Sequence, residues 1–299
     1  MTAPGTQVVD IPSGLPATVS SPTADDPRLR RLALNQKTIE RWSLPEAVAG
    51  CVRTGLEAIG LWREPVQAYG LAGSARLVAD AGLRVSSLCR GGFFTSLDDA
   101  AWKRALEANR RAIEEAATLG AECLVLVVGG LATGSRDLPA ARTRVAESIH
   151  ELLPHAVEHG VRLALEPMHP IYTADRGVVA TLSEALDIAE RFPVDAVGVV
   201  VDSFHVWWDP QIDSQIARAA GRIASVQLAD WITPLPHDAL LARGMLGDGH
   251  IDLRRLVALC DQAGYAGDIE VEIFNADIWA ADGAAVLETI RRRFIEHVS

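Results

Sequence analysis

The sequence has few of the features that mark secreted or membrane-bound proteins. Its 299 residues include only four cysteines, with no C-x-x-C pair, and three of them lie within apolar runs, as buried free thiols do. We therefore expect a cytoplasmic protein in a reducing environment. No stretch approaches the roughly 18 apolar residues of a membrane span. A basic segment followed by an apolar core is also missing from the start of the chain, so no signal peptide is expected.

Positive charge is scarce as well. Lys and Arg number 28 against 39 Asp and Glu, which gives a formal net charge of −11. Because contacts to nucleic-acid phosphates need a basic surface, this balance disfavours a nucleic-acid partner. The hydrophobic share of 49% and the charged share of 22% are those of an ordinary globular protein. The charge says little about small-molecule substrates.

Residues 1–30 lack any helical or strand periodicity. They are rich in Pro, Ser, Thr and Ala, and such a composition buries too little apolar surface to offset the entropy lost on ordering. We expect a flexible N-terminal extension here and a folded domain over residues 31–299. A strand in the run TQVVDI is the alternative.

Eight short runs rich in β-branched residues recur along the rest of the chain. Each is apolar nearly throughout rather than alternating, which is typical of strands that are covered on both faces. The runs span residues 31–36, 58–64, 84–90, 123–130, 161–167, 197–205, 223–231 and 268–274.

Segments with helical spacing separate these runs. In the clearest one, residues 101–120, five apolar residues share one helix face. Ser43 followed by Glu46 predicts a capped helix start, and Gly120 stands where a helix-ending glycine belongs. Eight strand–helix alternations without a second-domain break predict a single-domain α/β protein.

The number and size of these alternations match a (βα)8 TIM barrel. A doubly wound open sheet is the rival architecture. It would be favoured by a glycine-rich phosphate loop after the first strand, and the sequence has none there. We therefore expect the barrel.

Four consecutive predicted strands, the fifth to the eighth, end with oxygen-bearing side chains. In a barrel these ends form the active-site face, so Glu166, Asp202, Gln227 and Glu272 would meet at one depth. Three such carboxylates repel one another unless a cation lies between them. An all-oxygen set suits Mn²⁺ or Mg²⁺ better than Zn²⁺. We predict a divalent metal site, holding Mn²⁺ or else Mg²⁺ or Co²⁺; the alternative is that each carboxylate is a helix cap or a surface residue.

Five runs resemble motifs of the xylose-isomerase-like barrel superfamily. This group includes sugar isomerases and epimerases of the tagatose-epimerase type, inosose dehydratase, hydroxypyruvate isomerase and endonuclease IV. The resemblance covers about residues 31–299, and its motifs are specific as a set. The runs are LALEPMHP (163–170), VVDSFH (200–205), SVQLADW (225–231), GMLGDGHID (244–252) and VEIF (271–274).

The resemblance implies roles for individual residues. It implies one metal held by Glu166, Asp202, Gln227 and Glu272, with the two glutamates exchanging a proton on opposite faces of the substrate. It also implies that His205 contacts the substrate. Many sugar epimerases have histidine where this chain has Gln227, and glutamine is more similar to the dehydratases of keto-cyclitols and dehydroshikimate.

Further strand-end and loop residues are candidate substrate contacts. Arg90 ends an apolar run and precedes a turn over the barrel mouth, where it either binds a substrate oxygen or pairs with a carboxylate such as Glu64. Loop histidines are also commonly just solvated, and aromatic residues at the mouth also fit a hydrophobic lid between subunits. The candidates besides His205 are Arg90, His169, His250, Trp208 and Asp230.

We predict a metal-dependent sugar isomerase or epimerase that abstracts a proton next to a carbonyl of a non-phosphorylated carbohydrate. The alternative is a lyase on a 3-keto sugar or keto-cyclitol, similar either to inosose dehydratase or to C-glycoside deglycosidases, which add a small partner subunit. A non-catalytic carbohydrate-binding barrel is a third reading. Endonuclease IV would need a basic groove and more than eight histidines. The family resemblance implies a homo-oligomer, and no membrane partner is expected.

Overall fold

The computed structural model describes residues 22–23 and 26–299. Most of the extension predicted over residues 1–30 lies outside these described residues. Its last part differs from the prediction, because Pro27–Leu29 forms a 3-10 helix (η1) and the Leu29 side chain joins the hydrophobic core. The folded domain therefore begins before residue 31.

Eight parallel strands close into a barrel, which confirms the predicted (βα)8 architecture. Their order around the barrel is β1-β10-β7-β6-β5-β4-β3-β2, so neighbours in the barrel follow the order of the chain. The sequence predicted each of these strands, to within a few residues at the ends. Their bounds are β1 (Leu32–Asn35), β2 (Ala58–Trp62), β3 (Arg84–Gly92), β4 (Cys123–Val127), β5 (Arg162–Leu165), β6 (Val197–Asp202), β7 (Ile223–Leu228) and β10 (Ile269–Val271).

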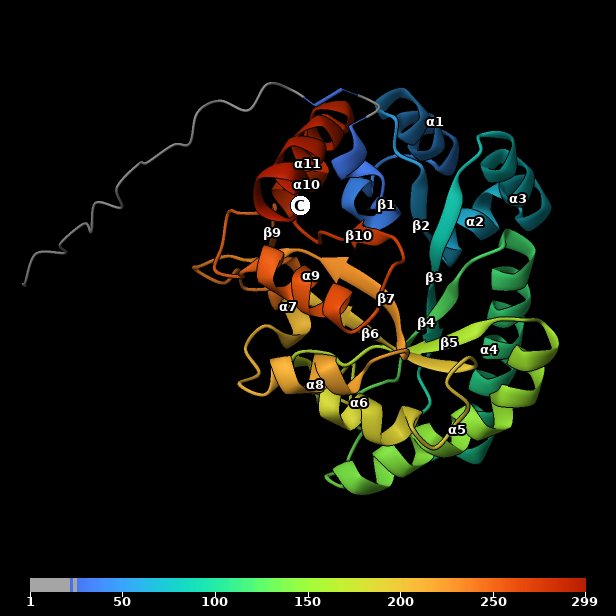
Figure 1. The fold of residues 1–299 in the computed structure, drawn as a ribbon. Helices are drawn as coiled ribbons and strands as arrows, with labels where there is room; N and C mark the ends of the chain where they lie inside the picture. Colours follow the sequence, from blue (N-terminus) through green and yellow to red (C-terminus); the bar gives the residue numbers. More distant parts are fainter. Residues whose placement is uncertain (1–21, 24–25) are drawn as a thin grey trace, which may run out of the picture.

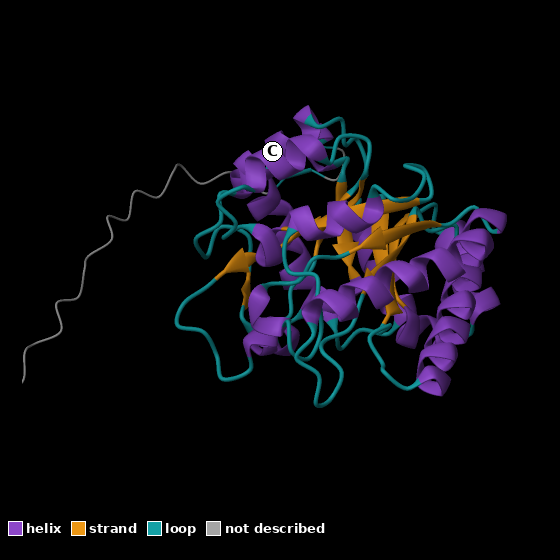
Figure 2. Cartoon of the chain, turned by 90° about the horizontal axis from the view of Figure 1, so that it is seen from below, coloured by secondary structure: helices purple, strands orange, loops and turns teal. Residues whose placement is uncertain are grey.

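Helices surround the barrel, as Figures 1 and 2 show from two directions. Short 3-10 helices, η2 (Gln36–Ile39), η3 (Pro170–Tyr172) and η4 (Ala239–Leu241), lie in the connecting loops. The α-helices are α1 (Leu44–Thr54), α2 (Arg63–Tyr69), α3 (Leu71–Asp80), α4 (Asp99–Leu119), α5 (Leu138–Glu158), α6 (Leu182–Ala189), α7 (Ser203–Val206), α8 (Ile212–Arg218), α9 (Leu253–Gln262), α10 (Ala276–Ala280) and α11 (Gly283–His297).

Local sequence explains where the helices begin and end. The Ser43 backbone N–H and hydroxyl donate to Glu46 Oε2 over 2.8 and 2.7 Å, so the predicted cap starts α1. Gly120 ends α4 with a φ of 66°, a left-handed conformation that favours glycine.

The barrel strands are buried on both faces. β2, β4 and β6 are buried along their whole length, which accounts for their non-alternating apolar sequences. Within the described part of the chain, no helix is both long enough and apolar enough to cross a membrane.

A short antiparallel pair stands outside the barrel. It consists of β8 (Asp230–Trp231) and β9 (Arg243–Gly244). Because β8 follows β7 almost directly, the pair lies at the C-terminal end of β7. This pairing holds Arg243 over the end of the barrel where the predicted ligands lie.

Candidate metal site

The four predicted ligands lie at the C-terminal ends of four neighbouring barrel strands. Glu166 follows β5, Asp202 ends β6, and Glu272 follows β10. Gln227 lies in β7, directly opposite Asp202 in the strand register. All four residues are buried. Barrel closure brings them together because these four strands are consecutive neighbours.

Glu166 and Asp202 are close enough to share a cation. Ligand atoms of Glu166, Asp202 and His205 lie within 4.8 Å of one another. Glu272 joins this group through Arg243, whose Nη1 lies 2.8 Å from Asp202 Oδ2 and 2.9 Å from Glu272 Oε2. The three acidic side chains therefore form one buried cluster.

Burial raises the pKa of each carboxyl group in this cluster, and repulsion between carboxylates adds to the rise for Glu166 and Glu272. Burial, followed by the charges of Glu272 and Asp202, raises the pKa of Glu166 well above its usual value. Burial raises the pKa of Glu272 to about 8 and also raises the pKa of Asp202. Positive charge between such groups stabilises their ionised forms. The cluster therefore favours the binding of a cation.

Arg243 is the residue of this cluster that sequence reasoning missed. Its guanidinium is buried, and Nη1 also donates to the Glu272 carbonyl oxygen over 3.0 Å. It lies in the two-residue strand β9, outside every apolar run, so strand-end reasoning had no reason to select it. Its position just before the predicted run 244–252 was the available signal.

The amide of Gln227 is held in one orientation. Its Nε2 donates over 3.2 Å to Oε2 of Glu270, a buried residue that also accepts from Asn35 Nδ2 and Ser86 Oγ, each over 2.7 Å. A carboxylate accepts hydrogen bonds, so Glu270 selects the amide nitrogen of Gln227. Gln227 Oε1 is left buried with no hydrogen-bond partner among the described residues. A buried carbonyl oxygen without a partner is available to a cation.

His205 stands beside the carboxylates as a neutral imidazole. Its Nε2 lies 3.8 Å from Glu166 Oε1, and burial above all lowers its pKa well below the usual value. Both ring nitrogens face N–H donors: Nδ1 lies 3.2 Å from the His169 backbone nitrogen, and Nε2 lies 3.1 Å from Arg243 Nη2. A neutral ring accepts only one such bond. A substrate oxygen that accepts from both Nε2–H and Arg243 would remove this conflict.

His169 and Trp208 form the wall behind His205. The ring centroid of His169 lies 4.9 Å from that of Trp231 and 5.6 Å from that of Trp208. Trp208 Nε1 donates to the His205 carbonyl oxygen over 2.8 Å. Burial lowers the pKa of His169 to about 4, so its ring is neutral at pH 7. Neither side chain lines the cavity that contains Glu166 and His205, so both support the position of His205 from behind.

The structure places Asp230 and His250 away from the carboxylate cluster. The oxygens of Asp230 accept from three backbone N–H groups over 2.8 to 3.0 Å, those of Trp231, Gly247 and Ile251. Asp230 therefore braces the loop that contains His250, which is itself exposed. The substrate contacts predicted for these two residues stay predictions; neither residue lines the cavity that contains Glu166 and His205.

Arg90 does not pair with Glu64, the carboxylate suggested as its partner by the sequence. Glu64 is exposed and forms no ion pair with Arg90 in the described structure. The neighbouring Arg63 pairs instead with Glu115, with 2.5 Å between Nε and Oε2. Arg90 lines the same cavity as Glu166 and adds a positive charge that lowers the pKa of that carboxyl group.

A small cavity connects these side chains. Its volume is about 40 Å³, and Glu166, His205, Arg243 and Glu272 line it. That volume holds one or two water molecules, so a sugar has to displace a lining side chain. Leu240, which also lines the cavity, belongs to the mostly exposed loop 232–242.

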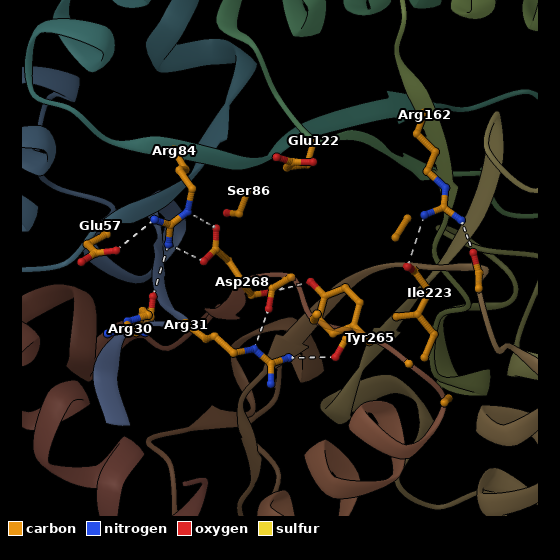
Figure 3. A pocket seen from close by; sticks show the side chains of 16 residues that line it. Arg30, Arg31, Glu57, Arg84, Ser86, Glu122, Arg162, Ile223, Tyr265 and Asp268 are labelled. Atoms are coloured by element: carbon orange, nitrogen blue, oxygen red, sulfur yellow. Dashed lines mark hydrogen bonds and ion pairs between the residues drawn. The ribbon is translucent and has the colours of Figure 1, made fainter. Parts of the chain in front are cut away.

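A much larger cavity of about 610 Å³ lies at the opposite end of the barrel (Figure 3). Most of its charged side chains already have partners. Arg84, at the start of β3, pairs with Asp268 and Glu57, and Arg162, at the start of β5, donates to backbone carbonyls. Residues at the N-terminal ends of barrel strands generally serve stability, and we assign these to that role.

Comparison with known proteins identifies the family. The model of the xylose isomerase-like TIM barrel matches residues 48–292, a segment that contains all four predicted ligands. The chain belongs to this family. The match confirms the resemblance inferred from the sequence motifs.

Two curated relatives have named activities. An inosose isomerase of Halalkalibacterium halodurans is 26% identical over 211 residues, which cover 69% of this chain and 72% of that protein. A 3-dehydroshikimate dehydratase of Pseudomonas aeruginosa is 27% identical over 273 residues. These cover 86% of this chain but only 41% of the dehydratase. Both relatives are enzymes, which supports an enzyme of this superfamily.

Solved structures share the whole fold. Protein SMc04130 from Sinorhizobium meliloti 1021 is 46% identical with a TM-score of 0.88, and the match covers 91% of this chain and 99% of that one. The IOLI protein, solved with a bound zinc atom, is 21% identical with a TM-score of 0.79 and covers 90% of this chain and 98% of that one.

Proposed function

We propose that the carboxylate cluster binds one divalent metal ion and that the protein isomerises or epimerises a non-phosphorylated keto sugar by abstracting a proton next to the carbonyl. The observation that carries this proposal is the convergence of Glu166, Asp202, Gln227 and Glu272 on one buried point. Such a cluster has a strong electrostatic need for a cation.

The donor set fits a hard divalent cation. Three carboxylates with raised pKa values and the unpartnered Oε1 of Gln227 make an all-oxygen set. Oxygen donors favour Mn²⁺ or Mg²⁺, with Co²⁺ as a substitute. The zinc atom in the IOLI protein makes Zn²⁺ the competing ion to test. A bound cation would supply Lewis-acid stabilisation of negative charge on substrate oxygens.

Glu166 and Glu272 would move the proton. Both carboxyl groups line the cavity, so either can reach a carbon-bound proton of a sugar placed there. Glu272 would accept the proton from carbon, and Glu166, on the opposite face of the substrate, would return one. Arg243 and the His205 Nε2–H would donate to the substrate oxygen whose charge grows.

A lyase is the second candidate. The dehydratase relative matches more of this chain than the isomerase does. Gln227 also stands where the dehydratases of the family have a similar residue. Elimination starts from the same proton abstraction, so the same side chains would serve. A cytoplasmic location, a homo-oligomer and, for a C-glycoside lyase, a small partner subunit stay predictions.

Proton exchange in D₂O tests the proposal. The purified protein would be reconstituted with Mn²⁺, analysed for metal content and incubated with a panel of keto sugars under NMR observation. We expect stoichiometric metal and entry of deuterium at one carbon next to the carbonyl. Loss of a substituent would favour the lyase. Absence of bound metal after reconstitution would contradict both enzyme proposals and leave a carbohydrate-binding barrel.

Glu270→Gln is expected to weaken Mn²⁺ binding by about 10- to 100-fold, the usual effect of losing a residue that orients a ligand. The substituted amide can donate as well as accept, so it no longer forces Gln227 to turn its oxygen toward the cluster. Isothermal titration with Mn²⁺ measures the change. Glu288→Gln, on the exposed face of α11, is the matched control. Equal Mn²⁺ affinity in wild type and Glu270→Gln would contradict the orienting role.

A further inference from the structure

We propose that the substrate of this site is an anion whose carboxylate group binds Arg90. The inference rests on the proposed function and narrows its substrate from keto sugars in general to acidic ones. The balance of charges around the cavity and the surroundings of Arg90 support it.

The local backbone turns the Arg90 side chain toward the cavity at the C-terminal end of the barrel. It is the unpaired residue of a bulge in β3, since Cys89 pairs with Val125 of β4 and Gly91 with Leu126. A bulge re-aims the side chain of its extra residue and is common beside active sites. The Arg90 side chain thereby lines the cavity that also holds Glu166 and Glu272.

Two aromatic rings fix the guanidinium. Arg90 Cζ lies 5.6 Å from the centroid of the Trp62 ring and 4.9 Å from that of the Phe93 ring. Phe93 has a φ of 61°, a left-handed conformation that costs a bulky residue free energy and that clusters at ligand-binding sites. Cation–π contacts use the faces of the guanidinium and leave its N–H edge open. Within residues 22–23 and 26–299, no hydrogen bond or ion pair involves that edge.

Charge around the cavity is in positive surplus once a metal is present. A divalent cation and Arg243 would balance the charges of Glu166, Asp202 and Glu272. Glu270, whose charge also acts on Glu272, does not line the cavity and is hydrogen-bonded by the uncharged side chains of Asn35, Ser86 and Gln227. Arg90 is then left over, and Arg176 lines the same cavity with only the exposed Asp175 near it, 3.6 Å away. A cationic mouth on a chain of net charge −11 runs against the overall composition. An anionic substrate would supply the missing charge.

The surroundings of Arg90 favour a carboxylate over a phosphate. A guanidinium edge matches the two oxygens of a carboxylate, whereas phosphate sites usually add backbone N–H groups. The backbone N–H groups that follow Arg90 already donate within the protein, that of Gly92 to Asn109 Oδ1 and those of Phe93 and Phe94 to carbonyls of the β4 end. None of these three is free to cradle a phosphate.

Binding of matched sugar pairs tests the inference. D-fructuronate and D-fructose, like D-tagaturonate and D-tagatose, differ only by a carboxylate or a hydroxymethyl group at C6. Isothermal titration of the Mn²⁺-loaded protein should show at least one uronate bound about 10- to 100-fold more tightly than its neutral partner, as a charge-assisted hydrogen bond gives. Arg90→Gln should bring this ratio close to one. Arg90→Lys should keep part of it, and Arg76→Gln, on exposed α3, should keep all of it.

Several results would overturn the inference. These are tighter binding of the neutral sugars, tighter binding of D-fructose 6-phosphate than of the uronates, or an Arg90→Gln variant that weakens uronate and neutral sugar equally. Metal content and deuterium exchange, measured on the same samples, separate this failure from failure of the proposed function. If deuterium enters a neutral ketose and no uronate binds more tightly, only the inferred carboxylate site is contradicted and the proposed function stands. Because the titration measures binding, the preference can be tested whether or not the sugar is turned over.

Discussion

Glu272→Gln is expected to lower turnover by a factor of about 10² to 10⁴ while leaving the fold intact. The amide keeps the size of the side chain and can still offer an oxygen to a metal, but it cannot accept the proton from carbon. It also removes one of the three charges that crowd the cluster, so the folded state loses the ion pair with Arg243 but gains from lower repulsion with Glu166.

The measurement is the rate of deuterium exchange with the keto sugar that wild type turns over, together with circular dichroism and a thermal unfolding curve. Glu288→Gln serves as control, because that carboxylate is exposed on α11 and does not belong to the buried cluster. Near-wild-type exchange by Glu272→Gln would end the assignment of Glu272 as a base. If Glu272→Gln lost its circular dichroism signal, it would not be folded, and the same exchange measurement would be made on Glu166→Gln.

Arg243→Met is expected to destabilise the metal-free protein by about 3–5 kcal/mol, and Mn²⁺ is expected to restore most of that loss. Removing one partner of a buried ion pair leaves uncompensated charge, and Arg243 bridges two buried carboxylates, Asp202 and Glu272. A cation among the same carboxylates replaces the missing charge. Mn²⁺ should therefore stabilise the variant more than it stabilises wild type.

Urea unfolding with and without Mn²⁺ measures both effects. Arg218→Met is the matched control, since Arg218 also contacts two carboxylates, Asp187 and Glu190, but at the surface. Surface pairs contribute about 0–1 kcal/mol, so this control should change little. If Arg243→Met were as stable as wild type, or if Mn²⁺ stabilised the two proteins equally, Arg243 would not share its carboxylates with a metal.

The fold and the convergence of the four candidate ligands could be predicted because both follow from strand ends. Runs that are apolar throughout mark parallel strands, and a closed barrel brings their C-terminal ends to one face. Glu166, Asp202, Gln227 and Glu272 each stand at such an end, so counting strands was enough to bring them together.

The rest of the site depends on contacts that periodicity does not encode. Arg243 reaches the cluster from a two-residue strand whose partner, β8, is set by tertiary packing. Asp230 is a candidate substrate contact because it is polar and follows a strand, and only the structure shows that it also accepts from backbone N–H groups of a later loop. Glu270 lies two residues before Glu272 on the same side of the strand. Only the structure shows that Glu270 contacts Gln227.

Anomalous diffraction from crystals of the Mn²⁺-loaded protein tests the central claim most directly. The account predicts one strong peak at the barrel mouth, within bonding distance of oxygens of Glu166, Asp202, Gln227 and Glu272. A second group of possible ligands, Glu114, His155 and His159, lies on α4 and at the end of α5. A peak at that group alone, or no peak among the four predicted ligands, would contradict the account.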